Sequence, residues 1–102
     1  MAFLVQILLP TKAQEVPFLS SQFAQVRSEL AEEFGGVTVY SRTTADGLWE
    51  SDRGVVEHDE VVLFEVMTNC LRRRWWRRYR RELEDRFQQT EVVVRAQIIR
   101  RL

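Results

Sequence analysis

Hydrophobic and polar residues alternate in four separate segments of the chain, and each segment is expected to be a β-strand. These segments are residues 3–9, 37–42, 61–67 and 91–99. Successive side chains of a strand point to opposite faces, so alternation gives each strand one face for a core. In the first segment Phe3, Val5, Ile7 and Leu9 share such a face. Pro10 ends this strand, and residues 10–17 are expected to form a polar connector.

Two segments between these strands have the spacing of amphipathic helices. Ser20 or Ser21 would cap the first helix, which should run to about Phe34, and Gly35 follows where a left-handed residue ends many helices. The second helix is expected over roughly residues 72–88. Both apolar stripes step by three, four and four residues: Phe23, Val26, Leu30 and Phe34, then Trp76, Tyr79, Leu83 and Phe87. The shared spacing indicates an internal repeat of two β-α-β units.

The predicted order of elements is therefore β-α-β-β-α-β, in one domain over residues 1–102. This order resembles the ferredoxin-like fold, an α+β fold with a four-stranded antiparallel sheet and both helices on one face. A length of 102 residues with 45% hydrophobic residues is enough for one core. Residues 41–60 form a long irregular stretch, which can hold strand ends and a hairpin turn near residues 52–54.

The sheet face away from the helices is predicted to be largely apolar. By alternation it carries Leu4, Gln6, Leu8, Leu63, Glu65, Met67, Val93, Arg95, Gln97 and Ile99. Monomers rarely leave such a patch in water, so we expect a homodimer or larger homo-oligomer built on this face. The face can serve only as an interface, or it can enclose a small-molecule pocket. Alternatively, subunits associate through helices or edge strands, and residues 41–60 cover the face.

The pattern resembles the dimeric α/β-barrel superfamily, in which two ferredoxin-like units pack sheet to sheet. The segments FGGVTVY and GLWE are also similar to those of small uncharacterised bacterial proteins. The superfamily includes cofactor-free monooxygenases and muconolactone isomerase-like enzymes. The resemblance implies a cofactor-free enzyme or small-ligand binder, whereas the absence of a convergent catalytic set favours a structural interaction module.

The candidate site residues are the polar exceptions on this face together with residues at the loop end. In ferredoxin-like strand order Gln6 should lie between Glu65 and Arg95, which can form a structural ion pair or the polar end of a ligand site. A pocket would also be bounded by Tyr40 and Trp49. Trp49 either plugs the core or covers the pocket.

The candidate general base is Glu65 or His58, although the favoured interpretation of His58 is a solvent-facing residue of a loop or strand edge. The sequence contains no glycine-rich phosphate loop, nucleophile elbow or paired-histidine motif. One His beside adjacent carboxylates is a poor metal site, so no metal and no cofactor is predicted. Cys70 is the only cysteine; nearby arginines can make its thiol reactive, but a buried, inert thiol is the expected outcome.

The zero net charge conceals a strong asymmetry along the chain. Residues 1–66 contain 4 basic and 11 acidic residues, whereas residues 67–102 contain 11 basic and 4 acidic residues. The arginine run, residues 72–81, reads RRRWWRRYRR. Its aromatic residues fall on the predicted core side of the helix, so we expect a solvated arginine face and no nucleic-acid binding. An acidic partner surface would also suit this face.

The apolar start of the chain is too short to span a bilayer and lacks the basic residues of a secretory signal. A cytoplasmic protein without a membrane partner is therefore expected.

Overall fold

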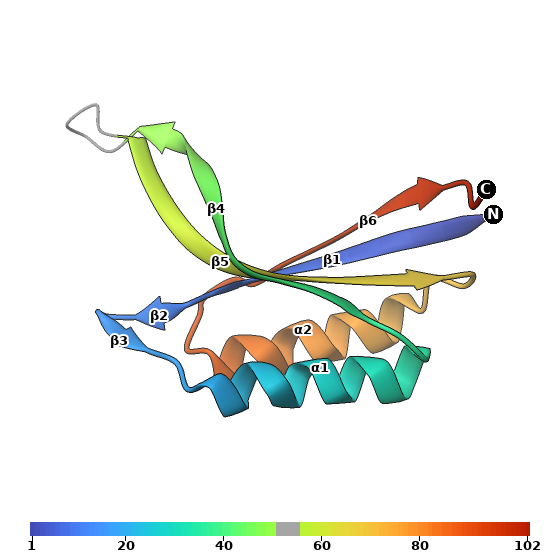
Figure 1. Cartoon of the computed structure of the whole chain (residues 1–102), viewed down its shortest axis with the longest axis horizontal. Coiled ribbons are helices and arrows are strands. Elements are labelled where there is room, and N and C mark those ends of the chain that lie inside the picture. Colours follow the sequence, from blue (N-terminus) through green and yellow to red (C-terminus); the bar gives the residue numbers. More distant parts are fainter. Residues whose placement is uncertain (51–55) are drawn as a thin grey trace.

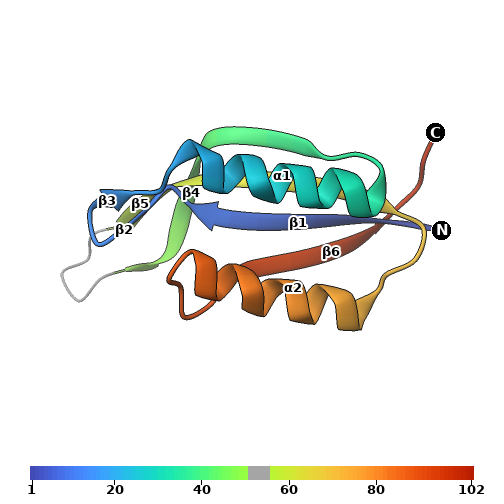
Figure 2. The same ribbon diagram turned by 90° about the horizontal axis from the view of Figure 1, so that it is seen from below.

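The computed structural model describes the backbone of residues 1–50 and 56–102, and the side chains of residues 1–41 and 60–102. Four strands form an antiparallel sheet in the order β4-β5-β1-β6. The strands are β1 (Ala2–Pro10), β4 (Thr38–Glu50), β5 (Val56–Thr68) and β6 (Val93–Ile99). The helices α1 (Ser20–Phe34) and α2 (Arg73–Arg86) cover one face of this sheet, side by side (Figures 1 and 2). The fold is ferredoxin-like, as the alternation of apolar segments predicted.

The central strand β1 sets the register of the sheet. Val5 lies opposite Val66 of β5 and Ala96 of β6, and Ile7 lies opposite Phe64 and Val94. Because the side chains of paired residues share a face, the apolar sides of β1 and β5 meet the helices together. Val5, Ile7, Leu9, Phe64 and Val66 are all at most 1% exposed.

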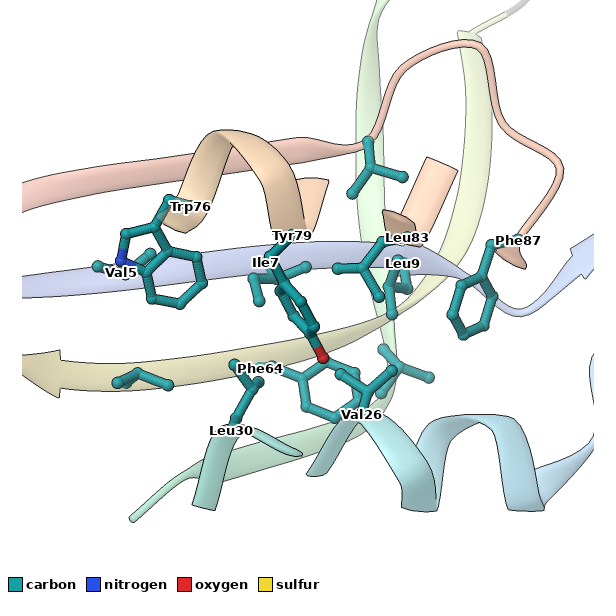
Figure 3. Packing of buried hydrophobic residues seen from close by; sticks show 13 residues of the cluster. Val5, Ile7, Leu9, Val26, Leu30, Phe64, Trp76, Tyr79, Leu83 and Phe87 are labelled. Carbon is teal, nitrogen blue, oxygen red and sulfur yellow. The ribbon is translucent and has the colours of Figure 1, made fainter. Parts of the chain in front are cut away.

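Both helices turn their predicted stripes toward the core, with Phe23 and Phe34 at the ends of the first stripe only partly buried. Val26, Leu30, Leu83 and Phe87 are fully buried, and Figure 3 shows them between the helices and the sheet. Aromatic rings extend the packing at one end, where the ring of Phe34 stacks on Trp76 at a centroid distance of 5.0 Å.

The start of α1 differs from the predicted one. Leu19 is the N-cap residue, and its backbone amide donates to Oε1 of Gln22 at 2.9 Å. Ser20 and Ser21 lie inside the helix and form no side-chain cap, so the prediction of a serine cap was wrong. Gln22 is the third residue of the helix, and its side chain accepts from the N-cap amide as the glutamine of a capping box does. The other end is as predicted: Gly35 has a φ of 81° and donates its amide to the carbonyl of Ala31 at 2.8 Å.

One connector differs from the predicted one, and a second segment agrees with its prediction. Within residues 10–17, β2 (Lys12–Ala13) pairs with β3 (Val16–Pro17). The turn residues Gln14 and Glu15 have φ values of 50° and 67°, as in a primed hairpin turn. Residues 41–50 and 56–60 belong to the ends of β4 and β5, in agreement with the strand ends expected in this stretch, and they bend toward the helix-free side of the sheet (Figure 1). The predicted turn at residues 52–54 lies outside the described residues.

Candidate functional site

The helix-free side of the sheet, here called the outer face, consists of cross-strand rows of side chains. One row contains Tyr40, Leu63, Leu8 and Val93, and another contains Met67, Leu4 and Gln97. Leu4, Leu8 and Leu63 are half-buried, whereas 47% of Tyr40 and 51% of Met67 remain exposed. No helix or strand of the described residues packs over this face (Figure 1). The outer face is therefore a mainly apolar surface without a cover.

A polar row crosses the outer face between these two apolar rows. The register aligns Thr38 of β4, Glu65 of β5, Gln6 of β1 and Arg95 of β6, one residue from each strand. The amide nitrogen Nε2 of Gln6 donates to Oε1 of Glu65 at 2.8 Å. The Nε atom of Arg95 donates to Oε1 of Gln6, also at 2.8 Å. Gln6 thus uses both ends of its amide to connect an anion with a cation.

The sequence prediction placed Gln6 between Glu65 and Arg95, and the structure has this arrangement. It does not contain the direct Glu65–Arg95 ion pair that was one interpretation: among the described residues the two groups are joined through the Gln6 amide. The reason is geometric, because Gln6 occupies the strand between them and neighbouring strands are about 4.8 Å apart. Thr38 was missed, although its position in an alternating segment could have placed it in the row once the register was known.

The other predicted site residues do not join this row. Tyr40 lies in the adjacent apolar row, half-exposed. The side chains of Trp49 and His58 fall outside the described residues. Two surface grooves in the described part of the chain, of about 590 and 470 Å³, have neither Glu65 nor Tyr40 in their lining. No group of three or more His, Cys, Asp or Glu side chains suited to a metal ion is present in the described residues.

A second polar cluster, which the sequence analysis did not identify, joins the two helices. Arg86 of α2 donates from both terminal nitrogens to the carboxylate of Glu29 in α1, at 2.6 and 2.7 Å. The hydroxyl of Tyr79 donates to Oε1 of the same carboxylate at 2.9 Å. The hydrogen bonds from Arg86 hold the pKa of Glu29 below its ordinary value, against the opposing effect of burial. Burial, and then the hydrogen bond to Glu29, raise the pKa of Tyr79 far above its usual range. This geometry is that of a structural clamp between the helices.

The arginine run lies on α2 as predicted, with its aromatic residues turned inward. Trp76 and Tyr79 are 6% and 5% exposed, whereas Arg74, Arg77 and Arg78 are exposed. The interior aromatic rings are unavailable for base stacking, so the arrangement is typical of a solvated cationic face.

Cys70 is exposed, so the expectation of a buried thiol was wrong. It follows the end of β5, beyond the reach of the core, in the turn that leads to α2. In the described part of the chain, neither helix is long and apolar enough to cross a membrane.

The comparisons with known proteins show the fold of this chain. No family model matches the sequence, and no curated protein matches it. The structure is similar to that of the divalent cation tolerance protein CutA1 from Thermus thermophilus, with a TM-score of 0.63 and 19% sequence identity, over 97% of this chain and 84% of that chain. It is also similar to a phage SAM lyase in complex with S-methyl-5'-thioadenosine, with a TM-score of 0.60 and 15% identity, over 94% and 80% of the two chains. At these identities the similarity concerns the fold alone.

Proposed function

We propose that this protein is an interaction module that assembles with a second copy of itself through the outer face. The observation that supports this proposal is the pair of uncovered apolar rows on either side of the polar row. Val93 is 44% exposed, Tyr40 47% and Met67 51%, and they continue the half-buried Leu4, Leu8 and Leu63. A contiguous apolar surface of this kind marks an association site, because leaving it in water is unfavourable.

The order of residues within the rows makes the outer face complementary to itself. A two-fold axis parallel to the strands, above the boundary between β5 and β1, would place each row against the same row of the second copy. Leu63 would then lie opposite Leu8 of the second copy, and Glu65 opposite Gln6 of the second copy. Apolar rows would meet apolar rows and no two carboxylates would face each other. An isologous interface requires this kind of self-complementarity.

The oligomeric state of two double variants tests this proposal. The first variant carries Leu63→Lys and Met67→Lys, which would bury two ammonium groups between the sheets. The control carries Gln25→Lys and Ser28→Lys, which add the same charge to exposed positions of α1. Light scattering on a sizing column should give an oligomer for the natural chain and the control, and a monomer of 12.1 kDa for the first variant. Circular dichroism establishes that both variants are folded. A natural chain that is monomeric at high micromolar concentration would refute the proposal.

A second candidate function is a small-ligand site at the polar row, enclosed between two copies. The observation that favours it is that only Oε1 of the half-buried Glu65 accepts a hydrogen bond from the described residues, so Oε2 can accept one from a ligand. S-methyl-5'-thioadenosine, which the similar phage SAM lyase binds, is the first probe. Its titration should shift the side-chain amide signals of Gln6 in the natural chain and not in the Glu65→Gln variant. Unchanged signals at millimolar probe would contradict this use of the probe.

A further inference from the structure

A groove of about 470 Å³ runs between α2 and β6, along the open edge of the sheet. Three arginines of α2 contribute to its lining, Arg73, Arg77 and Arg80; Arg95 of β6 is also a lining residue, but its Nε atom donates to Gln6 on the outer face. The lining contains no Asp or Glu. Apart from Gln97, the remaining lining residues are apolar or aromatic, among them Phe3, Val94 and Trp76. The groove therefore combines a cationic wall with an apolar lining.

The three arginines of α2 share one side of the helix because they are spaced by four and three residues. Among the described residues, neither Arg73 nor Arg77 forms an ion pair. Nε of Arg80 lies 3.8 Å from Glu84, too far for a hydrogen bond, and that carboxylate oxygen accepts from the backbone amide of Val92 at 3.0 Å. Among the described residues, the groove arginines without an ion pair are thus Arg73 and Arg77, whereas Arg80 has one distant ion-pair partner in Glu84.

Two buried donors beside the groove also lack acceptors. Nε1 of Trp76 and Nε of Arg80 have no hydrogen-bond partner in the described structure, and both residues contribute to the lining. Trp76 is only 6% exposed, and in Figure 3 its indole nitrogen lies on the side of the ring toward Val5, another lining residue. A buried N–H without an acceptor is unfavourable, and native proteins contain few of them.

We propose that this groove binds a phosphate monoester with an apolar body. A phosphate presents three acceptor oxygens and about two negative charges, which suits several guanidinium groups on one wall. The groove is larger than a phosphate needs, and its volume is within the range of small-molecule sites. The apolar lining would take the organic part of the ligand next to the Trp76 ring, while its oxygens pair with Arg77 and Arg80. This site lies at the edge of the sheet and is separate from the apolar rows of the outer face.

The test uses 1-naphthyl phosphate as the probe and the indole N–H signal of Trp76 as the readout. The chain has three tryptophans, and the Trp76→Phe variant assigns the signal by its loss. Titration of the natural chain should move this signal in a saturable way. Inorganic phosphate, which has only the charge, and 1-naphthol, which has only the rings, should each bind at least tenfold more weakly. A static signal, or equal affinity for inorganic phosphate, would overturn the proposal.

A matched pair of double variants separates a built site from general positive charge. Arg77→Gln with Arg80→Gln removes two groove arginines, whereas Arg78→Gln with Arg81→Gln removes two exposed arginines of the same helix that are not part of the lining. The Arg77→Gln, Arg80→Gln variant should bind 1-naphthyl phosphate at least tenfold more weakly than the natural chain, and the Arg78→Gln, Arg81→Gln variant less than twofold more weakly. Backbone amide spectra verify that both variants are folded. Equal losses in the two variants would show that only the net charge matters and would overturn the proposal.

Discussion

The substitution Gln6→Leu tests whether the polar row stabilises the fold. Gln6 is half-buried at the centre of the outer face, and its amide forms two hydrogen bonds of 2.8 Å with charged groups. Leucine has a similar size but no polar atoms, so the substitution leaves Glu65 and Arg95 without their shared partner. The row, and not the packing around it, is thereby perturbed.

The expected cost follows from the burial of the groups left behind. A hydrogen bond to a charged group contributes about 1.5–3 kcal/mol when it is buried. Glu65 is half-buried and Arg95 is exposed, so water recovers part of this loss. We expect Gln6→Leu to lower the free energy of unfolding by about 1–2 kcal/mol and the midpoint of thermal unfolding by about 5–10 °C. Because replacing both partners of a hydrogen bond is nearly neutral, adding Glu65→Leu should recover all but about 0.5 kcal/mol.

The assay is urea unfolding at pH 7 of chains that are otherwise natural, performed at several protein concentrations. Comparison at each concentration separates the contribution of self-association from the measured stability. The single variants and the double variant then form a thermodynamic cycle with a coupling of about 1 kcal/mol or more. A Gln6→Leu variant as stable as its parent, or a double variant whose losses simply add, would refute the assigned role of the row.

Three further substitutions test the interior and the helix ends by denaturant unfolding. Arg86→Met should lower the free energy of unfolding by about 1 kcal/mol at pH 7. The folded-state pKa of Glu29 is below its ordinary value of 4.5, so the stabilisation by the ion pair is present above pH 4.5. The difference in stability between the variant and the natural chain should therefore shrink as the pH falls further. A difference that stays constant down to pH 2 would contradict the ion pair. Phe87→Ala removes a fully buried ring and should cost about 3–5 kcal/mol, and a cost below about 1 kcal/mol would show that the ring is not in the core. Gly35→Ala should lower the free energy of unfolding by about 1 kcal/mol because of the φ of 81° alone, since a Cβ at this position meets no atom within 4 Å. Gly36→Ala is the control, because Gly36 has no positive φ. Equal losses of stability in the two variants would exclude the backbone explanation.

The helices and strands could be predicted because burial imposes a period on the sequence. The buried residues Leu30 and Leu83 belong to apolar stripes with helical spacing. Ile7 and Phe64 belong to segments that alternate with strand spacing, so the spacing of the core residues predicted the type of each element. The N-cap residue of α1 could not be predicted from this periodicity. Leucine has no polar side chain, and the role of Gln22 depends on a local geometry that hydrophobic periodicity does not report.

The polar groups could be predicted only where strand order was enough. The order of strands put Gln6 between Glu65 and Arg95, but the register and the hydrogen bonds of the amide came from the structure. The clamp of Glu29 and Arg86 joins residues 57 positions apart. The clamp depends on which turns of the two helices face each other, and the sequence does not give this alignment. Neither Glu29 nor Arg86 interrupts an apolar stripe, so neither residue stood out in the sequence pattern.

Contacts between copies across the outer face are the most direct test of the central claim. A sample that mixes ¹³C-labelled and unlabelled chains permits isotope-filtered nuclear Overhauser measurements, which detect only contacts between different chains. Self-association through the outer face predicts intermolecular contacts between methyl groups of Leu63 and Leu8, and further contacts from Leu4 and Met67. Intermolecular contacts confined to the helices, or none at concentrations where the sample is oligomeric, would contradict it.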